Sequence, residues 1–279
     1  MKKIALALVA ALVLLGVTRL QAAAEELKIA ITQAQAGDAR KYQPLLDYLA
    51  KKGVPAKFIS TQDYPSSAKL FSTGGVDAMF GGSGISGAMI MKKYADPLVR
   101  PVTNSGSSTY HGVIIAPKGA PAFAGDAAYF NGKRVIFAPL ATAGEFYFRS
   151  LGASSPKEIL KAANHGAAMD GIGRGVADVA VLKNHVWEAE KSKYPQLEKV
   201  GEDKGENPDG TLIVSRKLSA ASAKNIADIL LGIKTDTSAE AAAARDSLKI
   251  REFIPTTAAD FAHTIELIEK SGVGDAFGF

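Results

Sequence analysis

Short apolar runs alternate with segments of helical periodicity along the first third of the chain. Residues 27–31 form the first run, and leucines at positions 45, 46 and 49 then recur at the spacing of one helix face. Apolar runs at 56–60, 76–80 and 98–103 continue the series, with helical segments and short loops between them. Strands that alternate with helices in this way build a parallel sheet covered by helices. The pattern therefore predicts an α/β fold.

The alternation begins again after a polar loop at residues 104–112. An apolar run at 135–137 leads through Pro139 into a segment that is predicted to be helical from about Ala143. A strand at 179–182 follows, and another at 211–214 leads out of this second unit. Helices are predicted at 156–163, 167–172, 220–233, 239–248 and 260–271, with an extended piece at 253–255.

Two distant stretches share one arrangement. Gly75-Val76-Asp77 precedes an apolar strand and a polar turn, and Gly175-Val176-Ala177-Asp178 does the same. Matching strand-to-helix turns indicate two α/β lobes that face each other, with ligands bound at the carboxyl ends of the strands. Segments near 113–116 and 211–214 would join the lobes as a hinge. We expect lobe I to comprise residues 25–113 and 214–279, and lobe II to comprise residues 114–213.

The N-terminal segment has the composition of a secretory signal peptide. Lys2 and Lys3 precede an apolar run over residues 4–17, and three alanines at 22–24 supply a cleavage site. The apolar run is shorter than the roughly 20 residues that a membrane span needs. The chain has no cysteine, so disulfides and lipid attachment at a processed N-terminus are excluded. We expect residues 1–24 to be removed and the protein to lie in a bacterial periplasm.

The positive charge of the chain is small once this segment is removed. The full sequence has 33 Lys and Arg against 28 Asp and Glu, and removing Lys2, Lys3 and Arg19 leaves 30 against 28. There is no block of like charges and no alternation of basic and aromatic residues of the kind that nucleic-acid-binding proteins show. Nucleic acid is therefore not an expected partner.

The turn before the helix at 143 is the first candidate for chemistry. Thr142 followed by Glu145 has the spacing of a capping box, which places the helix start near Ala143. A helix start at the carboxyl end of a strand offers unpaired N–H groups and the positive end of the helix dipole, which suits a small oxyanion. The alternative is that Thr142 only caps its helix.

Gly82-x-Gly84-x-x-Gly87 is the second candidate. It follows a predicted strand and matches the dinucleotide-binding fingerprint, which also needs an acidic residue at the end of the next strand. Thr103-Asn104-Ser105 occupies that place, so dinucleotide binding is disfavoured. A glycine-lined helix start that holds a small anion, helped by the hydroxyl groups of Ser83 and Ser86, fits better. A tight turn that needs glycines for its backbone is the alternative.

Two further polar side chains lie where they could contact an anion. His165 precedes a predicted helix and could donate an N–H, although lone histidines are more often structural. Lys183 ends a predicted buried strand and, if it faces the cleft, supplies a full positive charge. No pair of side chains forms a nucleophile with its base, and four scattered histidines make a weak case for a metal. We therefore expect neither an enzyme nor a bound metal or cofactor.

The chain contains, in this order, Tyr42-x-x-Leu45, Gly75-Val76-Asp77, Ser107-x-x-Tyr110-x-Gly112, Phe137-Ala138-Pro139, Thr142-x-Gly144, His165 and Gly175-x-x-Asp178. In their order and spacing these pieces resemble the periplasmic phosphate-, phosphite- and phosphonate-binding proteins of ABC importers. The resemblance covers nearly the whole mature chain. It implies a type II periplasmic-binding-protein fold with two lobes that close on a ligand, and a membrane permease as partner. It also implies that Tyr42, Ser83, Tyr110, Thr142 and His165 line the cleft.

The sequence departs from the pattern of that family at several positions. Ala141-Thr142-Ala143 stands where the family usually has Ser-Thr-Ser, Ala138 replaces an aspartate, and Ile85 replaces a tyrosine. Lys183 aligns with an acidic residue that receives the ammonium group of an aminoalkylphosphonate. These changes disfavour aminoalkylphosphonates and favour a smaller or more anionic ligand.

The combined expectation is a monomeric periplasmic solute-binding protein for phosphate, phosphite or a phosphonate. Backbone N–H groups and the hydroxyl groups of Ser83, Thr142 and Tyr110 would hold the ligand oxygens, while His165 and Lys183 would offset the ligand charge. One alternative is a ligand-sensing partner of a membrane histidine kinase that uses the same cleft. Another is an enzyme built on the same two-lobed scaffold.

Overall fold

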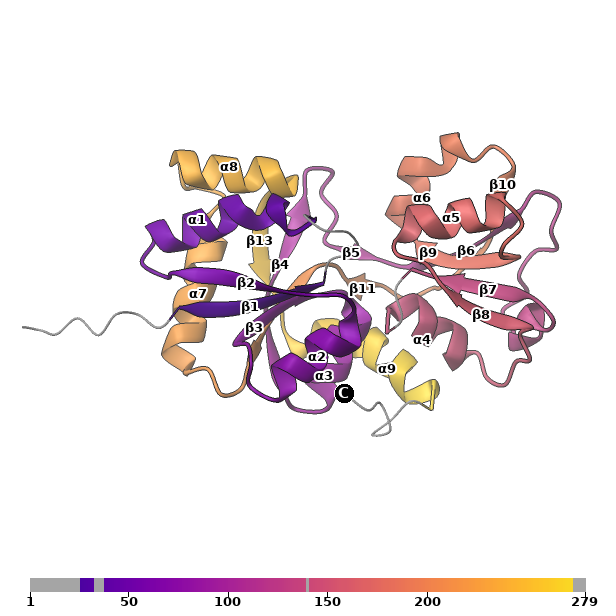
Figure 1. Ribbon diagram of the computed structural model, residues 1–279, viewed down its shortest axis with the longest axis horizontal. Helices are drawn as coiled ribbons and strands as arrows, with labels where there is room; N and C mark the ends of the chain where they lie inside the picture. The colour runs from indigo at the N-terminus through magenta and orange to yellow at the C-terminus, as the bar shows by residue number, and fades with distance from the viewer. Residues whose placement is uncertain (1–25, 33–37, 139–140, 273–279) are drawn as a thin grey trace, which may run out of the picture.

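The computed structural model describes residues 26–32, 38–138 and 141–272, in which two β-sheets lie side by side, each between layers of helices (Figure 1). The predicted signal peptide and Pro139 lie outside the described residues. The six-stranded sheet has the order β13-β4-β12-β3-β1-β2 and the five-stranded sheet the order β10-β6-β9-β7-β8. The first sheet comprises β1 (Leu27–Thr32), β2 (Ala56–Thr61), β3 (Ala78–Gly81), β4 (Ala95–Thr103), β12 (Thr211–Ser215) and β13 (Ile250–Pro255). The second comprises β6 (Gly112–Pro117), β7 (Arg134–Phe137), β8 (Glu158–Lys161), β9 (Val179–Lys183) and β10 (Leu197–Glu202).

Both sheets are mixed rather than wholly parallel. In the first, β1 pairs in parallel with β2 and β3, whereas β12 runs antiparallel to β3 and β4. In the second, β7 pairs in parallel with β8 and β9, whereas β6 runs antiparallel to β9 and β10. The parallel strands carry the crossover helices, so their carboxyl ends and the starts of these helices gather at one edge of each sheet.

Helices cover both faces of each sheet, as the α/β pattern predicts (Figure 1). In the first lobe one apolar cluster joins the sheet to three of the helices, and the other helices pack on the opposite face. The helices of the first lobe are α1 (Gln43–Lys51), α2 (Tyr64–Ser72), α3 (Ser83–Met91), α7 (Ala220–Gly232), α8 (Ala239–Leu248) and α9 (Ala262–Lys270). Those of the second are α4 (Ala143–Ser150), α5 (His165–Gly173) and α6 (Asn184–Glu190).

One predicted helix is wrong: residues 158–161 form the edge strand β8. Its backbone pairs in register with β7, from Arg134 opposite Glu158 to Phe137 opposite Lys161. Pro-Lys-Glu-Ile-Leu-Lys-Ala-Ala is a good helix former in isolation, but pairing with a neighbouring strand outweighs a local preference that is worth only about 0.7 kcal/mol per residue. Strand β10 was also missed from the sequence, because its polar alternation resembles a loop.

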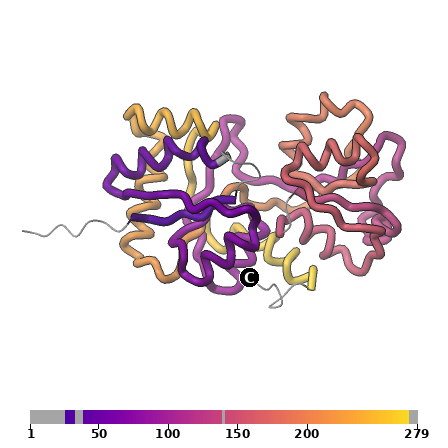
Figure 2. The backbone as a smooth tube through the Cα atoms, viewed as in Figure 1, coloured from indigo at the N-terminus to yellow at the C-terminus, as the bar shows by residue number. Residues whose placement is uncertain are grey.

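The chain passes between the lobes at a two-stranded ribbon. There β5 (Thr109–Tyr110) pairs antiparallel with β11 (Asn207–Pro208), and Figure 2 shows both segments running between the two halves. The expected hinge segments at 113–116 and 211–214 instead lie inside sheets, in β6 and β12, so the hinge prediction was wrong by a few residues. The division of the chain into lobes at 113 and 214 stays a prediction.

The lobes also share a buried apolar core. A single cluster runs from Met79 of the first sheet to Phe137 of the second, through α3, α4 and α9. Glycines allow the close approach of these helices: a Cβ atom on Gly84 would lie 2.5 Å from the carbonyl oxygen of Ala141, and one on Gly87 would lie 2.8 Å from Thr264 Cγ2. The glycine motif of α3 therefore serves helix packing across the junction between the lobes.

No helix in the described part of the chain is long and apolar enough to cross a membrane.

Candidate ligand-binding site

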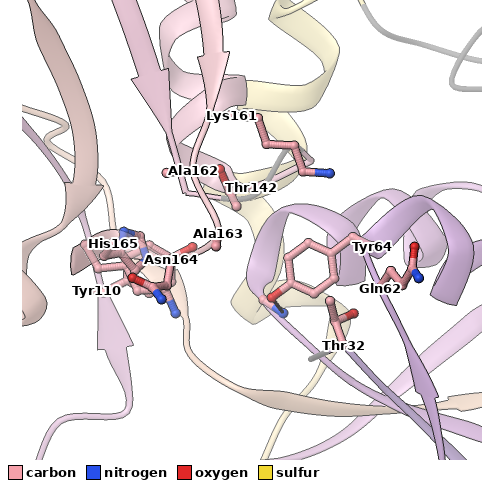
Figure 3. A pocket seen from close by; sticks show the side chains of 12 residues that line it. Thr32, Gln62, Tyr64, Tyr110, Thr142, Lys161, Ala162, Ala163, Asn164 and His165 are labelled. Atoms are coloured by element: carbon pink, nitrogen blue, oxygen red, sulfur yellow. Dashed lines mark hydrogen bonds between the residues drawn. The ribbon is translucent and has the colours of Figure 1, made fainter. Parts of the chain in front are cut away.

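A cavity of about 530 Å³ opens between the carboxyl ends of strands from both sheets. Thr32, Lys161 and Lys183 are the last residues of β1, β8 and β9, and all three line the cavity. Figure 3 shows Thr32, Gln62 and Tyr64 on one side, and Tyr110, Asn164 and His165 on the opposite side. The lining residues are Thr32, Gln62, Tyr64, Gly82, Tyr110, Thr142, Lys161, Ala162, Ala163, Asn164, His165 and Lys183. The two lobes thus present polar groups to one shared space, at the place where such sheets bind ligands.

Helices α2, α3, α4 and α5 begin at this cavity, and the short helix α6 directly follows Lys183, which also lines it. Tyr64 is the first residue of α2, Gly82 precedes α3, Thr142 precedes α4, and His165 is the first residue of α5. The first N–H groups of a helix have no partner within it, and the helix dipole places partial positive charge at this end. The cavity is therefore surrounded by partial positive charge from both lobes, which favours an anion.

Thr142 both caps α4 and lines the cavity. The backbone N–H of Glu145 donates to Thr142 Oγ1 at 3.3 Å, as the capping pattern predicts. A hydroxyl group that accepts one hydrogen bond can still donate another, so the two interpretations of Thr142 are compatible. Glu145 is buried and does not line the cavity, because its carboxylate accepts from the backbone N–H of Ala141 at 2.7 Å and pairs with Arg149 at 2.8 Å. Ala141 itself has a left-handed backbone, with φ of 64°.

His165 brings a buried ring nitrogen without a partner to the cavity wall. Its Nδ1 atom has no hydrogen-bond partner among the described residues. Burial, reinforced by the positive charge of Lys183, lowers the pKa of His165 to about 3. The imidazole is therefore neutral at neutral pH in these surroundings, and its expected role in offsetting the charge of a ligand stays a prediction. A neutral ring can still donate one N–H hydrogen bond to an oxyanion.

Tyr110, Ser83 and Lys183 meet at one end of the cavity. The hydroxyl groups of Ser83 and Tyr110 share a hydrogen bond of 2.5 Å, and Lys183 Nζ lies 4.4 Å from the centroid of the Tyr110 ring. Lys183 is also hydrogen-bonded to the carboxylate of Asp209. Ser83 is fully buried and does not line the cavity. Its hydroxyl reaches the site only through Tyr110.

Tyr42 and Ser86 lie farther from this cavity. Tyr42 packs against Phe58 and Phe80 and lines an adjoining cavity of about 460 Å³, which shares Lys183 with the first. Ser86 is fully buried, and a Cβ atom on Gly81 would lie 2.7 Å from its hydroxyl oxygen. That oxygen has no hydrogen-bond partner among the described residues. The structure thus brings Tyr110, Thr142, His165 and Lys183 together, with Ser83 behind Tyr110, Tyr42 in the adjoining cavity and Ser86 in the packed core. Ligand binding by these residues stays a prediction.

Several polar residues of the site were not found from the sequence. Gln62 and Tyr64 flank Asp63, whose side chain caps α2, and Asn164 caps α5 in the same way. These two caps could have been found, because an Asp or Asn before a helical segment is a recognised start signal. Asp209 lies in an Asn-Pro-Asp-Gly stretch, and such a stretch by itself indicates only a turn. In the part of the chain that the structure describes, no group of three or more His, Asp or Glu side chains is arranged to hold a metal ion.

Solved structures with the same fold cover nearly the whole chain. A binding-protein component of an ABC phosphonate transporter from Pseudomonas aeruginosa superposes with a TM-score of 0.71 at 15% identity, over 91% of this chain and 88% of that chain. PhnD1 from Prochlorococcus marinus, in complex with methylphosphonate, gives a TM-score of 0.69 at 17% identity, over 88% and 98% of the two chains. XAC2383 from Xanthomonas citri, bound to ATP, gives 0.73 at 15% identity, over 88% and 96%.

These structures confirm the predicted fold class, the two-lobed fold of type II periplasmic binding proteins. No curated protein sequence matches the chain. A sequence model of one family matches residues 29–261, and its description is the periplasmic substrate-binding protein of a phosphonate ABC transporter. The chain therefore belongs to the family of periplasmic substrate-binding proteins of ABC phosphonate transporters.

Proposed function

We propose that this chain captures a small oxyanion (phosphate, phosphite or a phosphonate) in the periplasm and delivers it to an ABC permease in the inner membrane. We propose further that it acts as a monomer after residues 1–24 are removed, and that it releases its ligand chemically unchanged. The observation that carries the proposal is the convergence of the helix starts and the unpaired Nδ1 of His165 on one polar cavity between the lobes.

The chemistry of the lining matches the demands of an anion. Removing an anion from water is costly unless hydrogen-bond donors replace most of its hydration. The hydrogen-bond donors are Thr142 Oγ1, an N–H of His165 and the backbone N–H groups of the helix starts. They come from both lobes, so they would approach a bound ligand from different sides. Lys161, whose side chain is 48% exposed, adds a cation at the rim. Donors from two lobes can surround a tetrahedral group, which a single helix start cannot.

Closure of the lobes would complete the binding site. The chain passes between the two sheets at the ribbon of β5 and β11, and rotation about such a connection changes few backbone angles. We propose that a bound oxyanion draws Gln62 and Tyr64 of the first lobe toward Asn164 and His165 of the second. The methylphosphonate in PhnD1 from Prochlorococcus marinus supports this class of ligand.

A thermal-shift screen tests the proposal. The mature protein is heated with phosphate, phosphite, methylphosphonate, sulfate or arsenate, and the ligand that raises the melting temperature is then titrated by calorimetry. A ligand present at about 100 times its Kd adds roughly 2.7 kcal/mol of stability by mass action. ³¹P NMR of the mixture should show the phosphorus ligand unaltered. No shift with any of the phosphorus oxyanions, or turnover of one of them, would refute the proposal.

A further inference from the structure

A cationic side chain of the protein is enclosed at the boundary between the two cavities. Lys183 lines both of them, Tyr110 lines the first and Asp209 the adjoining one. The side chains of Lys183 and Asp209 are 21% and 23% exposed, so both groups are largely withdrawn from water. They come from different parts of the fold, since Lys183 ends β9 and Asp209 lies between β11 and β12.

The surroundings of the Lys183 ammonium are those of an ammonium-binding cage. The Asp209 carboxylate is hydrogen-bonded to it, and the face of Tyr110 lies 4.4 Å away. His185 closes the group: its ring packs edge-on against Tyr110, and its Nε2 lies 3.5 Å from the second oxygen of Asp209. A carboxylate on one side and an aromatic face on another are the partners that proteins use to hold an alkylammonium ion.

The cage is electrically balanced without a ligand. Burial is the largest single effect on Lys183 and acts to lower its pKa, but the Asp209 carboxylate together with Tyr110 and Tyr64 outweighs burial, so the pKa lies above its ordinary value. Burial is also the largest single effect on Asp209 and acts to raise its pKa, but Lys183 together with His185 and His165 outweighs burial, so the pKa of Asp209 lies below its ordinary value. Both groups are charged at neutral pH, and each neutralises the other.

We propose that Lys183 is a specificity-determining residue: its ammonium fills a cage formed by Asp209, Tyr110 and His185, and so excludes oxyanions that carry an ammonium group of their own. The claim that Lys183 selects among oxyanions rests on the proposed function. The claim that the cage exists does not. A ligand such as methylphosphonate has nothing to place in the cage and needs only the helix starts. The ammonium of 2-aminoethylphosphonate would meet an occupied cage and a like charge, and both weaken its binding.

The first experiment compares two ligands on the wild-type protein by calorimetric titration. Methylphosphonate should bind at least about tenfold more tightly than 2-aminoethylphosphonate, because only the latter brings a second ammonium to Lys183. In Lys183→Ala this preference should shrink at least about tenfold. Lys161→Ala is the matched control, since Lys161 also lines the cavity but its salt bridge, to Asp63 at 3.8 Å, lies outside the cage. That variant should keep the wild-type preference.

The second experiment tests the cage without any oxyanion. The substitution Lys183→Ala removes a group equivalent to propylammonium, so free propylammonium should bind in the vacated cage. Propylammonium chloride should therefore raise the melting temperature of this variant above its values in sodium chloride and in 1-propanol. The wild-type protein should show no such difference. The double variant Lys183→Ala with Asp209→Asn should not show it either, because the carboxylate that holds the cation is gone.

Either of two results would overturn the proposal. One is equal affinity of the wild-type protein for methylphosphonate and 2-aminoethylphosphonate, which needs no variant to fold. The other is the lack of a specific effect of propylammonium on a folded Lys183→Ala protein. Failure of the wild-type protein to bind any phosphorus oxyanion would instead refute the proposed function, while the propylammonium measurement would still decide whether the cage exists.

Discussion

Thr142 lies at the start of α4, where one hydroxyl group faces both the helix and the cavity. Replacing it with valine keeps the shape but removes the donor to the ligand and the acceptor for Glu145. A hydrogen bond to a charged group contributes about 1.5–3 kcal/mol, so we expect oxyanion affinity to fall roughly ten- to a hundredfold. Loss of the cap should also lower the free energy of unfolding by about 1 kcal/mol.

Two variants control for this effect. Thr142→Ser retains the hydroxyl group and should bind nearly as well as the wild-type protein. Glu145→Gln should bind better than Thr142→Val, because Glu145 is buried behind the turn and its carboxylate contacts Ala141 and Arg149. Calorimetric titration of the three variants with one oxyanion measures the difference. Equal losses in Thr142→Val and Glu145→Gln would contradict this model of the site.

His165 should make the protein less stable in acid. Its pKa is about 3 in the folded protein and 6.5 ordinarily, so between these values the unfolded chain binds more protons. The contribution of His165 to stability is therefore present above pH 6.5 and is lost as the pH falls toward 3. From pH 7 to pH 5 the wild-type protein should lose about 2 kcal/mol more than His165→Gln. Urea unfolding at the two pH values provides the comparison.

His263 offers a control of opposite sign. Its Nε2 lies 2.8 Å from a carboxylate oxygen of Asp203, and this hydrogen bond raises its pKa above 6.5. The stability that His263 contributes is fully present below pH 6.5 and is lost as the pH rises through its folded pKa. His263→Gln should therefore be destabilised more at pH 6 than at pH 8. A pH dependence of the same sign in both variants would contradict these assignments.

At the scale of residues, the sequence revealed side chains whose position follows from a strand end or a helix start. Thr142 and His165 belong to this class, because a cap or a first helical residue is placed by its own element. It did not reveal Asp209, whose role depends on contact with Lys183 across 26 positions of the chain. Nor could it show that Ser86 is in the core, because α3 is apolar and buried on every side.

At the scale of elements, the local sequence pattern predicted a helix or strand correctly where its own apolar face or its cap residue determines the structure. Residues 239–248 form α8 as predicted, between the cap residue Ser238 and Lys249, which has a left-handed backbone. The pattern failed at β8, where the backbone of a helix-forming segment pairs with β7. It also failed to show that the glycines of α3 serve close packing, since that depends on α4 and α9.

Gly84 is the position where this packing can be tested. Its missing Cβ atom would lie within 2.7 Å of three backbone atoms of residues 141–143, which cannot rotate away as a side chain would. Gly84→Ala should lower the free energy of unfolding by about 1–3 kcal/mol. It should also weaken oxyanion binding, because the starts of α3 and α4 must separate. Urea unfolding and calorimetric titration measure the two effects.

Gly232 is the matched control for that substitution. It ends α7, and a Cβ atom there would meet no other atom within 4 Å. Gly232→Ala should be neutral or stabilise the protein by up to about 1 kcal/mol, because alanine favours the helix. If Gly84→Ala behaved like Gly232→Ala, the close contact between α3 and the turn before α4 would not exist in solution.

At the scale of the whole molecule, the apolar cluster shared by both lobes should make them unfold together. Trp187 is the only tryptophan of the chain and is buried in the second lobe, so its fluorescence reports on that lobe. Far-UV circular dichroism reports on the helices of both. Because Met79, Phe146 and Phe261 belong to one buried cluster, the two signals should change at the same urea concentration.

A variant in the junction sharpens this test. Phe261 is fully buried in the shared cluster and precedes α9. Phe261→Ala should cost about 3–5 kcal/mol, as large-to-small changes in a core do, and should lower the midpoint of both signals. A fluorescence transition that stayed in place while the dichroism transition shifted would mean that the lobes are stable independently.

The position of α9 has a consequence for the order in which the molecule is made. It packs against α3 and α4, which precede it in the chain by more than a hundred residues, in contacts that close the seam between the lobes. Until these late residues are available, the apolar surfaces of α3 and α4 lack their cover. The second sheet needs no strand beyond β10, but the first also needs β12 and β13, so the two halves can pack together only when the C-terminal part of the chain is present.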